Sequence, residues 1–150
     1  MPDIIIVSAC LAGVNCRYNG TNGKVDAIEE MVLSGQALPV CPEVLGGLAI
    51  PRKPCEIQFN GSEKRVISIT GEDATCFFQS GAEKTLAIAK TIGATTAILK
   101  SRSPSCGVGK LYDGSYTGRL VDGDGFTAAL FLRNNIQIFT EENFEVLLKE

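Results

Sequence analysis

The sequence predicts an α/β fold in three layers, with helices on both faces of a small, mostly parallel sheet and an additional β-hairpin or ribbon. The first observation is that short apolar runs rich in β-branched residues recur along the chain, as in strands that are buried on both faces. The second is that segments of helical periodicity separate these runs. Strands that alternate with helices favour crossover connections and therefore a parallel sheet.

Length and composition predict one ordinary domain over residues 1–150. Of the 150 residues, 45% are hydrophobic and 21% are charged, which excludes the disordered and collagen-like classes. No repeat, linker or low-complexity stretch divides the chain, and its length suffices for a core of its own. The 14 basic and 17 acidic side chains give a net charge of -3, so we expect no nucleic acid and no membrane as a partner.

The N-terminus predicts a cytoplasmic protein. Met1-Pro2-Asp3 carries no basic leader, and the apolar run that follows is too short for a signal peptide. No later segment approaches the length of a membrane span. The reducing cytoplasm disfavours structural disulfides.

The first third of the chain predicts two strands joined by a helix. Ile4–Val7 is a continuous apolar run and predicts a strand buried on both faces. Apolar residues then recur at helical spacing up to Gly35, which is placed to end the helix. These residues are Val25, Ile28, Met31 and Val32. Ala37–Val40 predicts the second strand.

The middle third predicts a loop, a hairpin and a long helix. Segment 42–54 contains three prolines and two glycines and is expected to be a loop. Alternating apolar residues on both sides of Asn60-Gly61 predict a hairpin or edge ribbon. Residues 75–92 place their apolar side chains on one helical face, and Gly93 is the expected stop.

The last third predicts two further strands of the sheet and two helices. Thr95–Leu99 is the third expected core strand, and Asp113-Gly114 predicts the tight turn of a second hairpin. The remaining expected elements are a helix capped by Asp122 or Asp124 and ending near Asn134, a strand over Ile136–Phe139, and a last helix from Glu141.

The absence of histidine limits the chemistry that this chain can perform. It excludes a Ser/His/Asp triad, a histidine-bearing metal site and a histidine general base. Six cysteines are many for 150 residues, and they are inert fillers, metal ligands or reactive thiols. They stand at Cys10, Cys16, Cys41, Cys55, Cys76 and Cys106.

Three of the cysteines follow the ends of expected strands. Cys10, Cys41 and Cys106 lie 31 and 65 residues apart, yet the carboxyl ends of parallel strands meet at one edge of a sheet, where ligands collect. A site of sulfur alone suits zinc, Cu(I) or an iron–sulfur cluster. Paired C-x-x-C spacing is absent, so a cluster fits better than zinc. The alternative is that all six cysteines only fill the core.

Polar residues near these cysteines are candidates for catalysis. Glu43 follows Cys41 by two residues on a proline-stiffened turn and would exchange protons near a desolvated cluster, unless it is a solvated loop carboxylate or a helix cap. Ser103 and Ser105 precede Cys106, and each either binds a polar substrate atom or caps a turn.

The other candidates have weaker support. Arg17 and Arg52 either neutralise the charge of a cluster, bind a carbonyl oxygen or are surface cations. Cys55 falls in the expected ribbon and Cys76 at a helix start, so both are expected to be structural.

Four segments, in this order, resemble the bacterial family catalogued as domain of unknown function 523, whose characterised members are thiouracil desulfidases. The resemblance covers nearly the whole chain, and the combination of segments is far more specific than any one of them. The segments are Ser8-Ala9-Cys10-Leu11, Cys41-Pro42-Glu43-Val44, Ser103-Pro104-Ser105-Cys106-Gly107 and Gly123-Asp124-Gly125.

The resemblance implies an enzyme that removes sulfur from thiolated nucleobases such as 2-thiouracil, releasing sulfide and the oxo base without a net redox step. It implies a 4Fe-4S cluster held by Cys10, Cys41 and Cys106, with one iron open to the substrate sulfur. Glu43 is then the proton-transfer residue and Ser103 a catalytic or substrate-orienting hydroxyl, whereas Cys16 is no ligand. The alternatives are a non-catalytic iron–sulfur or metal carrier or sensor, and a sulfur-transfer protein with one nucleophilic cysteine.

Overall fold

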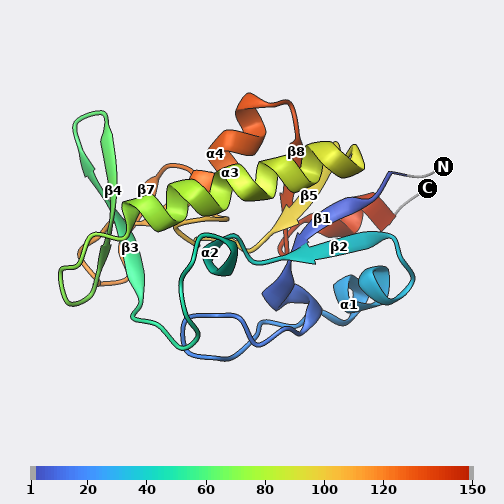
Figure 1. The fold of residues 1–150 in the computed structure, drawn as a ribbon, viewed down its shortest axis with the longest axis horizontal. Coiled ribbons are helices and arrows are strands. Elements are labelled where there is room, and N and C mark those ends of the chain that lie inside the picture. Colours follow the sequence, from blue (N-terminus) through green and yellow to red (C-terminus); the bar gives the residue numbers. More distant parts are fainter. Residues whose placement is uncertain (1–2, 149–150) are drawn as a thin grey trace.

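A four-stranded parallel sheet forms the centre of the computed structural model, which describes residues 3–148 (Figure 1). The strand order is β2-β1-β5-β8, and every neighbouring pair is parallel. The strands are β1 (Ile5–Ser8), β2 (Ala37–Val40), β5 (Thr96–Leu99) and β8 (Gln137–Thr140). The four expected core strands are confirmed to within one residue at each end.

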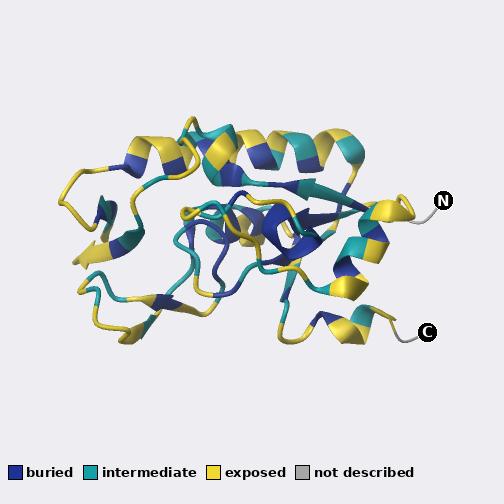
Figure 2. Ribbon diagram, turned by 90° about the horizontal axis from the view of Figure 1, so that it is seen from below, coloured by how far each residue is buried: buried dark blue, intermediate teal, exposed yellow. Residues whose placement is uncertain are grey.

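Helices cover both faces of the sheet. The long helix α3 (Thr75–Ile92) and α4 (Phe126–Arg133) lie on one side, and α1 (Asp26–Leu33) lies on the other (Figure 1). Adjacent residues of β1 point to opposite faces: Ile6 packs in the core under α3 and α4, and Val7 in the core under α1. Figure 2 shows the helices alternating between buried and exposed residues, as amphipathic helices do. The predicted three-layer fold is confirmed.

Two antiparallel ribbons lie beyond the sheet. The hairpin of β3 (Cys55–Asn60) and β4 (Glu63–Ser68) turns where it was expected, and β6 (Lys110–Tyr112) pairs with β7 (Leu120–Asp122). A small third core of buried apolar residues joins both ribbons to the start of α3. It contains Ile57, Val66, Ala74, Phe78 and Leu111.

The structure corrects two expected loops. The segment after Cys41 is not all loop, because Pro42 occupies the first turn of a short helix, α2 (Pro42–Leu45), where a missing N–H costs nothing. The tight turn expected at Asp113-Gly114 is wrong, since residues 113–119 form a wider loop between β6 and β7. This loop is held by Glu56, whose carboxylate accepts the N–H groups of Gly114 and Tyr116 at 3.0 and 3.1 Å.

The C-terminal helices also differ from the prediction. Gly125 is the N-cap of α4 and no side chain caps the helix, because Asp124 accepts the N–H of Gly109 instead and Asp122 pairs with Lys110. The last helix does not begin at Glu141; it is a 3-10 helix, η2 (Phe144–Leu148). No helix within residues 3–148 is both long enough and apolar enough to cross a membrane.

Candidate functional site

A cavity of about 460 Å³ opens at the carboxyl ends of the sheet strands. The chain leaves β1 toward β2 on one side, whereas β5 and β8 extend the sheet on the other side. Order reversal of this kind separates the loops that follow the two central strands, here β1 and β5, and forms a crevice in which ligands bind. The far wall consists of residues 52–56 at the start of the β3–β4 hairpin, together with Tyr112 and Tyr116.

The structure brings Cys10, Cys41 and Cys106 to this one cavity. Cys10 lies in η1 (Ala9–Ala12), a 3-10 turn that follows β1 directly. Cys41 follows β2 as the N-cap of α2, and Cys106 lies in the turn after β5. Cys10 and Cys106 are 8% and 3% exposed. Three sequence-distant thiols therefore face one volume, as expected from the strand ends.

The three thiols share an electrostatic environment. Burial raises the pKa of Cys10 to about 11, against the field of Lys100, and Cys41 and Glu43 raise it further. Burial also raises the pKa of Cys106, although a hydrogen bond from the Ser8 hydroxyl opposes the shift. Each of these two thiols responds to the charge of Cys41, as expected for thiols that line one cavity. Buried thiols of this kind lose their protons when a cationic metal centre binds them.

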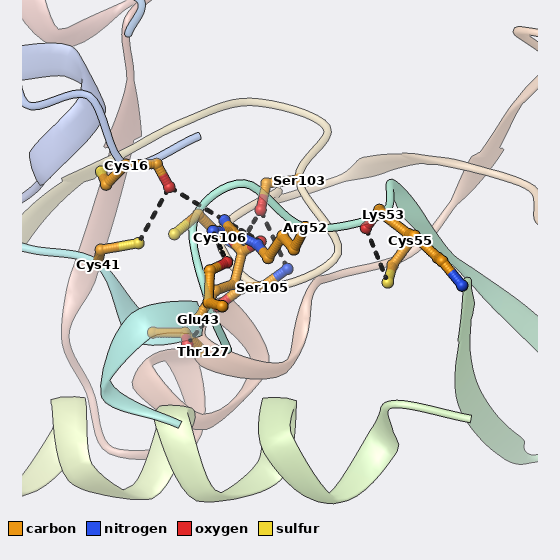
Figure 3. Close-up of polar contacts among 11 residues, drawn as sticks. Cys16, Cys41, Glu43, Arg52, Lys53, Cys55, Ser103, Ser105, Cys106 and Thr127 are labelled. Atoms are coloured by element: carbon orange, nitrogen blue, oxygen red, sulfur yellow. Dashed lines mark hydrogen bonds and ion pairs between the residues drawn. The ribbon is translucent and has the colours of Figure 1, made fainter. Parts of the chain in front are cut away.

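Cys16 lies next to Cys41, a contact that was not predicted from the sequence. The thiol of Cys41 faces the backbone carbonyl of Cys16, with a sulfur–oxygen distance of 3.8 Å (Figure 3). A hydrogen bond from the Cys16 thiol, working against burial, lowers the pKa of Cys41 to about 7, and the same contact raises the pKa of Cys16. The contact therefore makes Cys41 the more acidic thiol of the pair.

The two remaining cysteines differ from each other. Cys76 is exposed on α3 and does not line the cavity. Cys55 begins β3 in the expected ribbon, and it also lines the cavity, on the opposite side from Cys41 (Figure 3). Burial raises the pKa of Cys55 to about 11, and its sulfur lies 3.6 Å from the carbonyl oxygen of Lys53.

Glu43 and Arg52 form an ion pair inside the cavity. Arg52 Nη2 lies 2.9 Å from Glu43 Oε2 and 3.1 Å from the carbonyl oxygen of Cys16 (Figure 3). The two side chains are only 8% and 18% exposed. Arg52 is therefore no surface cation, and Glu43 is no solvated loop carboxylate.

Ser103 and Ser105 take different places around the turn before Cys106. Ser103 Oγ accepts the N–H groups of Ser105 and Cys106 at 3.1 and 3.0 Å, so it caps this turn, and it also lines the cavity. Because it accepts both bonds, its own proton is available to a ligand. Ser105 is fully buried and shares a hydrogen bond of 2.8 Å with the hydroxyl of Thr127, which fastens the turn to α4.

Sequence reasoning missed three residues at the strand ends. Ser8, the last residue of β1, accepts the N–H of Lys100 at 2.9 Å and supports Cys106. Lys100 follows β5 and lines the cavity, and its ammonium lies 2.7 Å from Glu141 Oε2 at the end of β8. The rule that located the cysteines at strand ends would have located Ser8, Lys100 and Glu141 too.

Arg17, which was a candidate from the sequence, lines the same cavity.

The arrangement of the three thiols indicates whether they would hold a single metal ion or a cluster. Among residues 3–148, no three Cys, Asp or Glu side chains are grouped so as to hold a single metal ion. The three thiols instead border a cavity of several hundred cubic ångströms, and soft sulfur donors suit iron–sulfur clusters. The residues therefore fit a cluster better than a single ion.

Fold and site together define a class: a three-layer α/β protein with a thiol-lined cavity at the carboxyl end of its sheet. The family model described as 2-thiouracil desulfurase matches residues 5–143, and the chain belongs to this family. The resemblance to the domain of unknown function 523 is thus confirmed.

Two similar proteins extend this comparison. A solved structure named [4Fe-4S]-dependent thiouracil desulfidase TudS superposes with a TM-score of 0.89 at 40% identity, covering 97% of this chain and 95% of that one. The uncharacterized protein YbbK of Bacillus subtilis (strain 168) is 41% identical over 152 residues, which is 97% of this chain and 100% of YbbK.

Proposed function

We propose that the protein is an iron–sulfur-dependent enzyme that removes sulfur from small thiolated nucleobases such as 2-thiouracil. Water supplies the oxygen of the oxo base, sulfur leaves as hydrogen sulfide, and no electrons are exchanged. The observation that carries the proposal is the convergence of Cys10, Cys41 and Cys106 on one cavity in a chain of the 2-thiouracil desulfurase family. The similarity to a [4Fe-4S]-dependent desulfidase supports the choice of cofactor.

We assign Cys10, Cys41 and Cys106 as the ligands of a 4Fe-4S cluster with one iron left without a protein ligand. When bound, the cluster would supply a thiophilic iron that acts as a Lewis acid toward the sulfur of a C=S bond. The chain prepares the site for this anionic group. The hydrogen bond from the Ser8 hydroxyl lowers the pKa of Cys106, and the field of Lys100 lowers the pKa of Cys10; both oppose the effect of burial.

Glu43 and Ser103 are assigned to the substrate. Glu43 lies in the cavity beside the thiols, where its carboxylate would take a proton from the water that attacks the thiolated carbon. Ser103 would donate its free hydroxyl proton to a polar atom of the ring.

The direct test is anaerobic purification followed by assays of iron, acid-labile sulfide and release of sulfide from 2-thiouracil. We expect about four irons per chain and sulfide release, because three thiolates hold a cubane cluster. Cys106→Ala should lose both, whereas Cys76→Ala should keep both, since Cys76 is exposed and remote from the cavity. A metal-free wild-type protein with six free thiols would refute the proposal.

A Glu43 variant separates the enzyme from a cluster carrier or sensor. Glu43→Gln should retain its iron and lose turnover by on the order of 100-fold, the usual contribution of general base catalysis. Glu83→Gln on the exposed surface of α3 is the matched control and should match wild type. Cluster-loaded wild-type protein that releases no sulfide from thiolated bases would favour the carrier.

A further inference from the structure

Arg52 connects two parts of the site that are far apart in sequence. Its guanidinium donates to Glu43 on α2, to the carbonyl of Cys16 in the loop before α1, and more weakly to the carbonyl of Ala49 at 3.4 Å. The Cys16 carbonyl in turn faces the Cys41 thiol. One side chain therefore bridges the candidate proton-transfer group and the loop that supports a candidate cluster ligand (Figure 3).

The electrostatics of the cavity explain why Glu43 needs this partner. Glu43 lines the same cavity as Cys10, Cys41 and Cys106, and its side chain is only 18% exposed, so its charge is largely removed from water. A carboxylate in this position would regain solvent by rotating out of the cavity unless a cation holds it. The Arg52 guanidinium opposes the rotation with a charge-assisted hydrogen bond of 2.9 Å.

We propose that Arg52 is a positioning residue, which holds the Glu43 carboxylate over the thiol-lined cavity and fixes it relative to Cys16 and Cys41. The inference rests on the proposed function, in which Glu43 moves the proton. Arg52 Nη2 contacts both Glu43 and the Cys16 carbonyl, and lysine should not replace it fully, because a flexible ammonium does not fix its N–H directions as the planar guanidinium does.

The kinetic test uses Arg52→Ala, Glu43→Gln and the double variant, each assayed for kcat, KM and iron per chain. Arg52→Ala should lower kcat by roughly 10- to 100-fold with KM and iron content nearly unchanged, as loss of a group that orients a catalytic residue does. The double variant should be no slower than Glu43→Gln, because a residue that acts through Glu43 adds nothing once Glu43 is gone.

Chemical rescue distinguishes positioning from simple packing. Added guanidinium, far below denaturing concentrations, should restore part of the kcat of Arg52→Ala but none of the double variant. Arg65→Ala is the matched control, because Arg65 on β4 pairs at 2.6 Å with Asp73, which lies just before α3, and Arg65 does not line the cavity. It should keep wild-type kcat and show no response to guanidinium.

Crystal structures of the metal-free wild-type and Arg52→Ala proteins provide a measurement that does not need activity. We expect the Glu43 carboxylate to leave the cavity in the variant. Two results would overturn the proposal. One is a Glu43 carboxylate that stays in place in Arg52→Ala. The other is a double variant whose kcat is below that of Glu43→Gln by the same factor by which Arg52→Ala is below wild type. Arg52→Lys replaces Arg52→Ala if the latter misfolds. A wild-type protein without turnover would refute the proposed function alone, since the carboxylate position still decides the role of Arg52.

Discussion

At the scale of single residues, the contact between Cys16 and Cys41 makes a testable difference in thiol reactivity. In the metal-free protein the pKa of Cys41 is lowered to about 7, chiefly by the hydrogen bond from the Cys16 thiol. We predict that alkylation of Cys41 by iodoacetamide, followed by mass spectrometry, rises with a midpoint near this pH. In Cys16→Ala the midpoint should move upward, and the rate at neutral pH should fall by on the order of tenfold, because less thiolate is present.

Cys16→Ser is the control for this prediction, because its hydroxyl remains a donor. It should keep the low midpoint of the wild type. Measurements in a Cys76→Ala background remove the signal of the exposed thiol on α3. An unchanged midpoint in Cys16→Ala would show that the hydrogen bond does not control the Cys41 thiolate.

The sequence allowed the convergence of Cys10, Cys41 and Cys106 to be predicted because each follows a short buried strand. It did not reveal the place of Arg52. A sequence with one arginine among prolines and glycines gives no sign that the side chain turns inward, since its burial depends on Glu43 and on a carbonyl from another loop. The ligand and catalytic roles themselves stay predictions.

At the scale of elements, α2 and α3 touch through two glycines. A Cβ on Gly81 would lie 2.0 Å from the carbonyl oxygen of Pro42, and one on Gly46 would lie 2.0 Å from that of Phe77. Each overlap is with backbone, so the helices must separate to accommodate it. This close packing holds α2, and with it Cys41 and Glu43, at the edge of the cavity.

We predict that Gly81→Ala lowers the free energy of unfolding by about 2 kcal/mol in urea denaturation. Overpacking of this kind costs about 3 kcal/mol, and the gain in helix propensity of about 1 kcal/mol does not offset it. Gln79→Ala, at an exposed position of the same helix, should change stability by less than about 0.5 kcal/mol. Wild-type stability in Gly81→Ala would mean that α2 is free to shift.

The end of β8 is tied to the loop after β5 through Glu141. Burial alone would raise the pKa of Glu141, but hydrogen bonds from Lys100 and from the amide and hydroxyl of Ser101 outweigh it and lower the pKa. A carboxyl group whose pKa is lower in the folded state stabilises the fold above its unfolded pKa. This contribution is lost as the pH falls through the folded value.

We therefore predict that the metal-free protein loses stability more steeply below about pH 4.3, the usual pKa of glutamate, than Glu141→Gln does. Urea denaturation at a series of pH values measures the difference. Glu142→Gln is the control, because the Glu142 side chain is 60% exposed and its contact with Arg102 is long, at 3.4 Å. Identical pH dependences of wild type and Glu141→Gln would contradict this account.

Elements with strong local signals were predicted well, and those set by distant contacts were not. Helix α3 spans Thr75–Ile92 as expected, because an apolar face that is repeated over eighteen residues distinguishes a helix clearly from a strand. The 113–119 loop was mistaken for a tight turn because its shape depends on Glu56, which lies 58 residues before Gly114. Asp124 was mistaken for a helix cap because its partner, the Gly109 amide, comes from another element.

At the scale of the whole molecule, the proposed cluster would link the ends of β1, β2 and β5. A group that binds only the folded chain stabilises it by mass action. We predict that anaerobic removal of iron by a chelator lowers Tm by roughly 5–10 °C, which corresponds to a few kcal/mol for a chain of this size. Calorimetry of Cys106→Ala should show a Tm that does not depend on iron. An equal decrease in Tm on removal of iron from that variant would mean that the metal binds elsewhere.

The overall architecture was the most predictable part, since alternation of strands and helices restricts the topologies that a short chain can form. The extent of the domain over residues 1–150 and the cytoplasmic location stay predictions, and residues 1–2 and 149–150 lie outside the described part of the chain.

The position of β5 in the sheet has a consequence for biosynthesis. It pairs with β1 at the centre of the sheet, yet it emerges from the ribosome only after two thirds of the chain, and Cys106 follows it. In the proposed enzyme, a nascent chain that displays Cys10 and Cys41 still lacks its third ligand. Delivery of iron and sulfide would then complete a scaffold that has already assembled, and cellular supply of the inorganic core would limit how much active protein accumulates.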